Sequence, residues 1–208
     1  MHRLAAMLGI SAVGLFAFAL VVFSGLNPGF KPLDDYVSTL GAAGQPYALW
    51  WNVIGFVVVG ALLAGFGLTY GRILQDRFVG VLLALFGVGF GATGVPIDLR
   101  DGSAPLSKAH VVAICLGLAA WMLGLARMAY LPSLGKSIRA SANIAAALLA
   151  LPLLGQGAQL WSMPVTHRLV FLVVFGWVAM TSIRLLRGAQ SGGRCRRRSC
   201  SGRRFARH

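Results

Sequence analysis

The chain has 208 residues, of which 57 % are apolar and only 12 % are charged, and its mean hydropathy is +0.75. These values exclude a disordered chain, and they are unlike those of soluble domains, in which about a quarter of the residues are charged. The 19 Lys and Arg face 5 Asp and no Glu, so the formal net charge is +14, and three Cys are too few for a disulfide framework.

Six largely apolar runs follow one another along the chain. A helix needs about 20 apolar residues to cross a hydrocarbon core of about 30 Å, and a helix pairs all its backbone polar groups internally. The runs lack the period-two alternation of outer-membrane strands. We therefore predict an all-α, polytopic integral membrane protein with six transmembrane helices in a bundle. The expected spans are residues 4–26, 47–70, 78–97, 109–128, 140–160 and 167–186.

The first run also has features of a cleavable signal peptide, because His2 and Arg3 supply a charged start. Its apolar stretch is about 20 residues long, whereas the apolar region of a signal peptide usually has about 7–15. We therefore expect a helix that is retained in the mature protein.

Basic residues are distributed unequally between the two sides of the predicted bundle. With the N-terminus inside, the inner segments hold 15 of the Lys and Arg residues and the outer segments hold 4. Cytoplasmic segments of membrane proteins carry the excess of basic residues. Both termini are therefore expected in the cytoplasm. The outer basic residues are Lys31, Arg100, Lys108 and Arg168.

The first outer loop, residues 27–46, is long for a connection between two helices. Asp35, Tyr36 and Ser38 form a compact polar group that could bind a ligand as a lid. Asp34 or Ser38 could instead cap a short re-entrant helix, since both residue types are good N-caps. Both interpretations stay open at this point.

Small residues recur every few positions from Gly87 to Gly94. This spacing favours the close approach of two helices, most simply within one chain.

Most of the titratable side chains fall on the predicted outer side. Asp98 ends the third run, His110 begins the fourth and His167 begins the sixth. If these three helices adjoin, the side chains converge in one shallow pocket. Ionisable groups at the membrane boundary are costly unless they are paired, so they indicate a site. The outer acidic and histidine residues are Asp34, Asp35, Asp98, Asp101, His110 and His167.

The residues from 188 to 208 differ from the rest of the chain. They hold seven Arg among Gly and Ser and show no apolar period, so we expect a disordered cytoplasmic tail. The tail is either simply solvated or contacts anionic lipid headgroups, at about 1 kcal/mol per basic residue. The expected partner of the whole chain is the lipid bilayer; nucleic acid is not expected, and the oligomeric state is not predicted.

One block carries a resemblance to a known family. Asp35-Tyr-Val-Ser-x-Leu-Gly-Ala-x-Gly-x-Pro46, followed by Asn52, resembles a bacterial family of six-span membrane proteins named only as domain of unknown function 998. The resemblance covers about residues 5–187 and implies a six-span protein of the bacterial cytoplasmic membrane, with no assigned reaction. His167 departs from the family pattern, in which an acid or amide precedes the arginine. The other matching positions are Pro96, Asp98, His110, Arg168 and Trp177.

The first hypothesis of function is a membrane protein without catalysis, which binds a lipid or small ligand or acts as an accessory subunit. Its polar outer-face cluster would hold the first loop to the helices, with Asp98 in an ion pair with Lys108 or Arg168. Asp35, Tyr36 and Arg168 are then the candidate ligand-binding residues.

The second hypothesis is an intramembrane, lipid-directed hydrolase. Asp98 and His110 would be its acid–base pair, or metal ligands with His167 as the third, since catalytic zinc usually has three protein ligands. In a variant, Ser38 is the nucleophile and His110 its base. No G-x-S-x-G or H-E-x-x-H motif is present, and the sequence identifies neither a metal nor a cofactor.

A transporter is the third hypothesis. It requires polar or broken-helix features near the bilayer midplane. Asn52 and Gln156 are among the few such residues.

Overall fold

A computed structural model describes the backbone of residues 1–201 and the side chains of residues 1–188. Within these limits the chain is all-α, which confirms the predicted fold class. The elements are α1 (His2–Leu26), the 3₁₀ helix η1 (Val37–Gly41), α2 (Ala48–Trp51), the π-helix η2 (Asn52–Val58), α3 (Val59–Leu74), α4 (Arg77–Ala92), α5 (Pro105–Tyr130), α6 (Lys136–Gly157) and α7 (Met163–Ser201).

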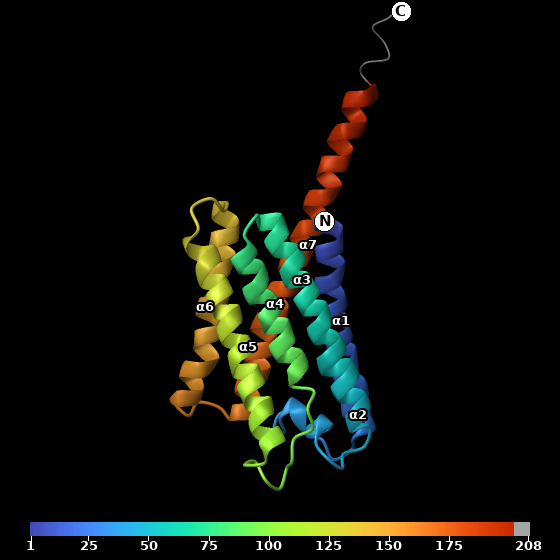
Figure 1. Ribbon diagram of the computed structural model, residues 1–208, viewed down its shortest axis with the longest axis vertical. Coiled ribbons are helices and arrows are strands. Elements are labelled where there is room, and N and C mark those ends of the chain that lie inside the picture. Colours follow the sequence, from blue (N-terminus) through green and yellow to red (C-terminus); the bar gives the residue numbers. More distant parts are fainter. Residues whose placement is uncertain (202–208) are drawn as a thin grey trace, which may run out of the picture.

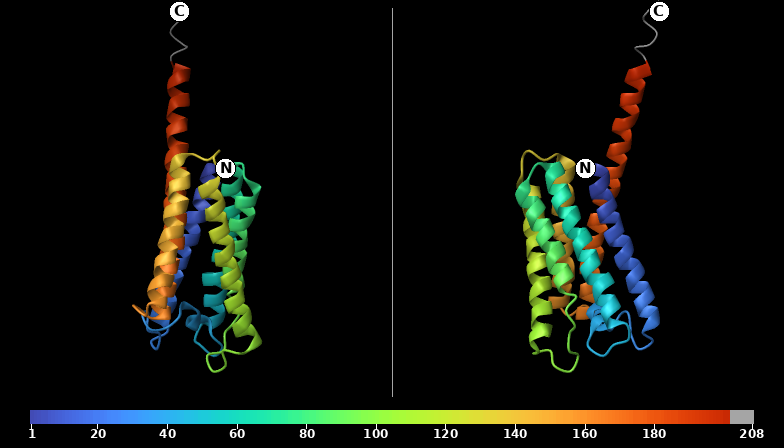
Figure 2. Two further views of the ribbon diagram at one scale, coloured as in Figure 1. Left: turned by 90° about the vertical axis from the view of Figure 1, so that its left-hand side faces the viewer. Right: turned by 45° about the vertical axis from the view of Figure 1, so that its right-hand side comes forward.

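The long helices stand side by side in a bundle (Figures 1 and 2), and their contacts form a ring. Each contacts the next along the chain, from α3 to α4, α5, α6 and α7, and α1 closes the ring by contacting both α3 and α7. Met1 lies at one end, here called the Met1 end. The first loop (27–47) lies at the other, here called the first-loop end, together with the connections 93–104 and 158–162. This arrangement brings residues that are far apart in the sequence together at each end.

Five helices within the described part of the chain are long and apolar enough to cross a membrane, whereas α4 is shorter. α4 has 16 residues and ends at Ala92, although the sequence predicts a span over residues 78–97. Beyond it, Pro96 lacks an N–H and restricts the residue before it to extended backbone, so the apolar run continues without a helix. Residues 93–97, the last part of this predicted span, therefore belong to a loop.

The second predicted span, residues 47–70, is one continuous helical rod of three elements, α2, η2 and α3. Its π-helical part begins at Asn52, whose side chain is buried. π-Helical insertions rotate the residues that follow them and recur at functional sites. Asn52, the first residue of this insertion, faces the first loop and donates a hydrogen bond to the carbonyl of Gly41.

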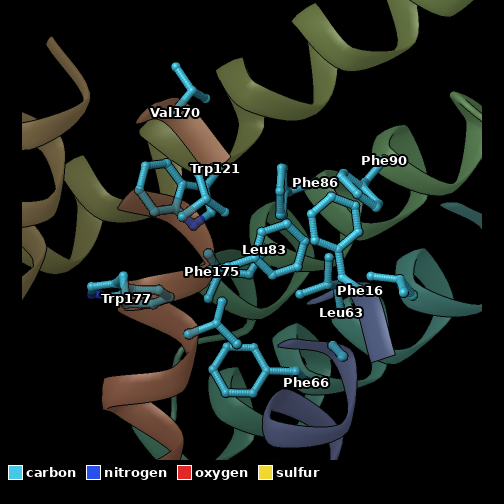
Figure 3. Close-up of a cluster of buried hydrophobic side chains, with 14 of the residues drawn as sticks. Phe16, Leu63, Phe66, Leu83, Phe86, Phe90, Trp121, Val170, Phe175 and Trp177 are labelled. Carbon is cyan, nitrogen blue, oxygen red and sulfur yellow. The ribbon is translucent and has the colours of Figure 1, made fainter. Parts of the chain in front are cut away.

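Aromatic side chains fill the centre of the ring (Figure 3). Phe16 of α1 stacks on Phe175 of α7 with ring centroids 4.5 Å apart, and Phe90 of α4 meets Phe16 edge-on at 5.6 Å. Trp121 of α5 lies edge-on to Trp177 of α7 at 5.9 Å. The packing at the centre of the ring is therefore largely aromatic.

Glycines bring α3 and α4 together at backbone distance. A Cβ atom at Gly67 would lie 2.6 Å from the backbone nitrogen of Ala84, and one at Gly60 would lie 2.5 Å from the Cα of Gly91. The close helix approach predicted for residues 87–94 is therefore confirmed. Gly87 and Gly91 face α3, whereas Gly89 faces Gly117 of α5, so both partners belong to the same chain.

The last helix, α7, projects beyond the bundle at the Met1 end (Figure 1). The expected arginine-rich tail, residues 188–208, lies almost wholly outside the side chains that the structure describes. Its expected disorder stays a prediction.

Candidate ligand site at the first-loop end

The first loop folds back into the bundle. η1 buries Val37 and Leu40, and the buried Asn52 donates its Nδ2 hydrogen to the carbonyl oxygen of Gly41 at 2.9 Å. Gly41 has to be glycine, because any Cβ would collide with the Asn52 side chain. The N–H of Ala43 donates to the carbonyl of Ile97 at 2.9 Å, which joins the loop to the α4–α5 connection.

Neither Asp34 nor Ser38 caps this short helix. The N-cap residue is Tyr36, and no side chain makes a capping hydrogen bond there. Asp35 instead accepts a hydrogen bond from the N–H of Lys31 at 2.6 Å, so its carboxylate closes a turn ahead of η1. The Tyr36 ring packs against the His167 ring with centroids 5.1 Å apart.

Asp98 organises the α4–α5 connection rather than meeting His110. Its Oδ1 accepts hydrogen bonds from the N–H groups of Arg100 at 2.8 Å and Asp101 at 3.3 Å, and its own N–H donates to the Ser107 hydroxyl at 3.0 Å. The side chain is exposed. Asp98 forms no ion pair with Lys108 or Arg168, because the described residues contain a single salt bridge and it lies elsewhere.

Asp101 plays a similar part in the same connection. Its Oδ1 accepts hydrogen bonds from the hydroxyl and the N–H of Ser103, at 2.6 and 2.8 Å. These bonds hold the pKa of the Asp101 carboxyl below its usual value. Asp98 and Asp101 are thus both used to fix the α4–α5 connection.

His110 lies on the second turn of α5 and faces the bundle. Its Nδ1 is 2.8 Å from the carbonyl oxygen of Thr93, which can only accept, so Nδ1 carries the hydrogen. In the neutral ring Nε2 is then an acceptor.

Ser38 and His167 line the same small cavity as His110, of about 30 Å³. The structure therefore brings Ser38, His110 and His167 together and leaves Asp98 outside. A water molecule requires about 10–15 Å³ on this measure, so the cavity accommodates about two waters and no lipid headgroup. Within the described residues, no three His, Cys or Asp side chains are grouped so that they could hold a metal ion.

A larger, apolar groove of about 390 Å³ runs between α1 and α7. Phe16 and Leu20 form its α1 wall, and Phe171 and Phe175 form its α7 wall. Beside Gly176 of α7 nothing lies within 4 Å of where a Cβ would be, so this glycine leaves the groove open. Val37 and Phe171 also line the small cavity, so the two spaces are neighbours.

Arg168 stands at the first-loop end of the groove and is its one charged lining residue. Its Nη1 donates to the carbonyl of Pro164 at 3.2 Å, and its guanidinium lies 5.9 Å from the centre of the Phe30 ring. Its Nη2 is buried and has no hydrogen-bond partner among the described residues. Asp35 is near enough to act on Arg168 electrostatically, but it forms no ion pair with it.

The comparison with known families gives one match. The family model described as "Protein of unknown function (DUF998)" matches residues 10–184. The chain belongs to the DUF998 family. No curated protein and no solved structure matches the chain.

The DUF998 match spans both the groove and the small cavity, and it carries no assigned activity. Sequence reasoning found Arg168 but missed the groove walls on α1. Their signal in the sequence is weak, because Phe16 and Leu20 are ordinary residues of an apolar helix. They line a groove only because α7 packs beside α1 and closes the ring.

Proposed function

We propose that this DUF998 protein binds a lipid, with one acyl chain in the α1–α7 groove and an anionic headgroup at Arg168. The observation that carries the proposal is the buried, unpartnered Nη2 of Arg168 at one end of an apolar groove. A buried guanidinium hydrogen without an acceptor is costly, and a phosphate satisfies it with a charge-assisted bond.

The proposal includes the number of membrane spans and the orientation of the protein in the bilayer. We infer six spans, with the short α4 as the sixth, because its 16 residues are apolar and its neighbours are of membrane length. Sixteen residues extend about 24 Å, and thinning of the bilayer accommodates the difference from about 30 Å. The positive-inside rule places Met1 and the C-terminus in the cytoplasm, with Arg168 in the outer leaflet of a bacterial cytoplasmic membrane. The basic tail would contact anionic headgroups of the inner leaflet.

The polar residues of the first loop then have a supporting role. Asn52 and Tyr36 hold η1 and His167 in place, so that the wall of the groove at Val37 is fixed. Asp35 offsets part of the Arg168 charge while the site holds no anion.

Retained lipid tests the proposal directly. The full chain is purified in mild detergent from membranes that contain phosphatidylglycerol and phosphatidylethanolamine, and bound lipid is identified by native mass spectrometry. We expect one phosphatidylglycerol per wild-type chain. Arg168→Gln should lose this lipid, and Gly176→Leu should exclude it by filling the groove.

Arg100→Gln is the matched control, because Arg100 is an exposed arginine at the same end that does not line the groove. It should keep the lipid. An equal lipid complement in wild type and Arg168→Gln would disprove the proposal.

A lipid-ester hydrolase is the second candidate function. It is favoured by Ser38 and His110, which line a cavity that shares the Val37 and Phe171 walls with the groove. It ranks second because this cavity accommodates only about two waters and because Asp98 lies outside it. Wild-type protein that releases fatty acid from a fluorescent phosphatidylglycerol, with no release by Ser38→Ala, would move this candidate to first place.

A further inference from the structure

A second pocket lies at the opposite, Met1 end of the bundle. It has a volume of about 250 Å³ and is enclosed by α1, α3, α6 and α7. Its floor is apolar, and its polar lining comes from Tyr70, Thr181, Ser137, Ser141, His2 and Arg184. No carboxylate lines it. The lipid groove at Arg168 shares no residue with it.

Two buried residues that line this pocket carry hydroxyl groups without a hydrogen-bond partner among the described residues. Tyr70 is 4 % exposed and Thr181 is 7 % exposed, and no hydrogen bond to either hydroxyl is present in the described part of the chain. The Tyr70 ring is held by stacking on Phe66 at 5.5 Å and by an edge contact with Trp177 at 6.1 Å. The ring that carries the hydroxyl is therefore fixed at the pocket, and a ligand bound there can accept the hydroxyl hydrogen.

Arg184 supplies a charge that is not neutralised. Among the described side chains its one hydrogen bond runs from Nη2 to the sulfur of Met180 at 3.5 Å, and thioether sulfur is a weak acceptor. The one acidic residue at this end, Asp76, is paired with Arg127 at 2.7 Å. A stronger acceptor would displace the Met180 contact at little cost.

Helix geometry adds to the positive potential. The pocket is lined by the first turn of α1, at His2, and by the first turn of α6, at Ser137 and Ile138. The N–H of Ile138 already donates to the carbonyl of Gly135 at 3.0 Å, so α6 contributes through its dipole. The helix dipole makes the start of each helix positive. Two such ends, one guanidinium and several hydroxyls together form an anion-binding environment.

We propose that this pocket binds a phosphate group, with Arg184 as the charged ligand and the Tyr70 and Thr181 hydroxyls as donors. The phosphate belongs either to a lipid headgroup of the leaflet at the Met1 end or to a small soluble phosphate compound. Both sources offer the same chemistry, namely an anion with several acceptor oxygens for a fork of N–H donors.

The experiment measures binding to the full, delipidated chain in detergent by isothermal titration calorimetry. One arm titrates inorganic phosphate and the other titrates short-chain phosphatidylglycerol. Arg184→Gln should weaken binding at least about tenfold, since a hydrogen bond to a charged group is worth about 1.5–3 kcal/mol. Tyr70→Phe keeps the stacked ring and should weaken binding several-fold, which separates loss of a donor from loss of folding.

Arg72→Gln is the control for total charge, because Arg72 is an exposed arginine at the same end that does not line the pocket. Arg168→Gln is the control for the groove. Both controls should bind inorganic phosphate as the wild type does, and the phosphatidylglycerol arm is run in the Arg168→Gln background so that the groove does not contribute. Binding in the first arm assigns a soluble phosphate, and binding in the second arm alone that Arg184→Gln weakens assigns a headgroup. Binding in neither arm, or an equal loss in Arg184→Gln and Arg72→Gln, would overturn the proposal.

Discussion

Gly67→Ala should destabilise the bundle although alanine is the better helix former. The added Cβ would lie 2.6 Å from the nitrogen of Ala84, whereas ordinary contacts begin at 3.4 Å. The obstructing atoms belong to the α4 backbone and cannot rotate away, so the two helices have to separate.

Overpacking of this kind costs about 1–3 kcal/mol, and the gain in helix propensity from Gly to Ala returns at most about 1 kcal/mol. The rigid backbone contact places the cost at the upper end, so we expect a net loss of about 2 kcal/mol in the free energy of unfolding. Gly14→Ala on α1 is the matched control. Nothing lies within 4 Å of its Cβ position, so it should be neutral or stabilising.

Both variants are unfolded with dodecyl sulfate in mixed micelles, and helicity is followed by circular dichroism. The reasoning would be refuted if Gly67→Ala were as stable as Gly14→Ala, because α3 and α4 would then not be in backbone contact.

The remaining predictions concern buried polar groups. The hydrogen bonds from Arg127 hold the pKa of Asp76 below its usual value. The carboxylate therefore contributes stability above the unfolded-state pKa of about 3.9, and this contribution is lost as the pH falls through the lower folded-state pKa. In acid unfolding, Asp76→Asn should show a weaker loss of stability with falling pH than the wild type; parallel curves would contradict this. Asp76→Ala also removes the N-cap bond to Val79 and should cost about 1 kcal/mol more than Asp76→Asn in urea titrations at neutral pH. Asn52→Ala leaves the Gly41 carbonyl without its donor, so amide hydrogen exchange in residues 37–43 should accelerate; unchanged exchange would show that the Ala43 bond alone holds the loop.

The helices could be predicted from the sequence because apolar length alone determines them in a bilayer. The end of the third run could not, since the run stays apolar to Ile97 while the helix ends at Ala92. Pro96 was the available signal, because the residue before a proline avoids helical backbone.

The structure brings some of the candidate site residues together, since Ser38, His110 and His167 line one cavity. His110 and His167 lie near the starts of α5 and α7 at the same end of the bundle, but these helices are not neighbours in the ring, and Ser38 reaches the cavity through the fold of η1. Asp98 does not join them, because the stretch Asp98–Ser103 forms turns in which both aspartates bond to backbone N–H groups. Asp and Ser beside Gly102 are typical of such turns, so the local sequence already favoured the loop role. The Met1-end pocket could not be found, since its walls come from four helices whose order in space the sequence does not determine.

The ring has one contact that differs from the others. Every other neighbouring pair of helices is joined by a stretch of chain, but α1 and α7 meet as the first and last helices with no connection between them. They can part without stretching a loop, and they can meet only after α7 has been synthesised. The α1–α7 groove lies on this contact, so a molecule bound there touches both sides of the one joint at which the bundle can open. A molecule bound in the groove would therefore hold α1 and α7 together and keep the ring closed.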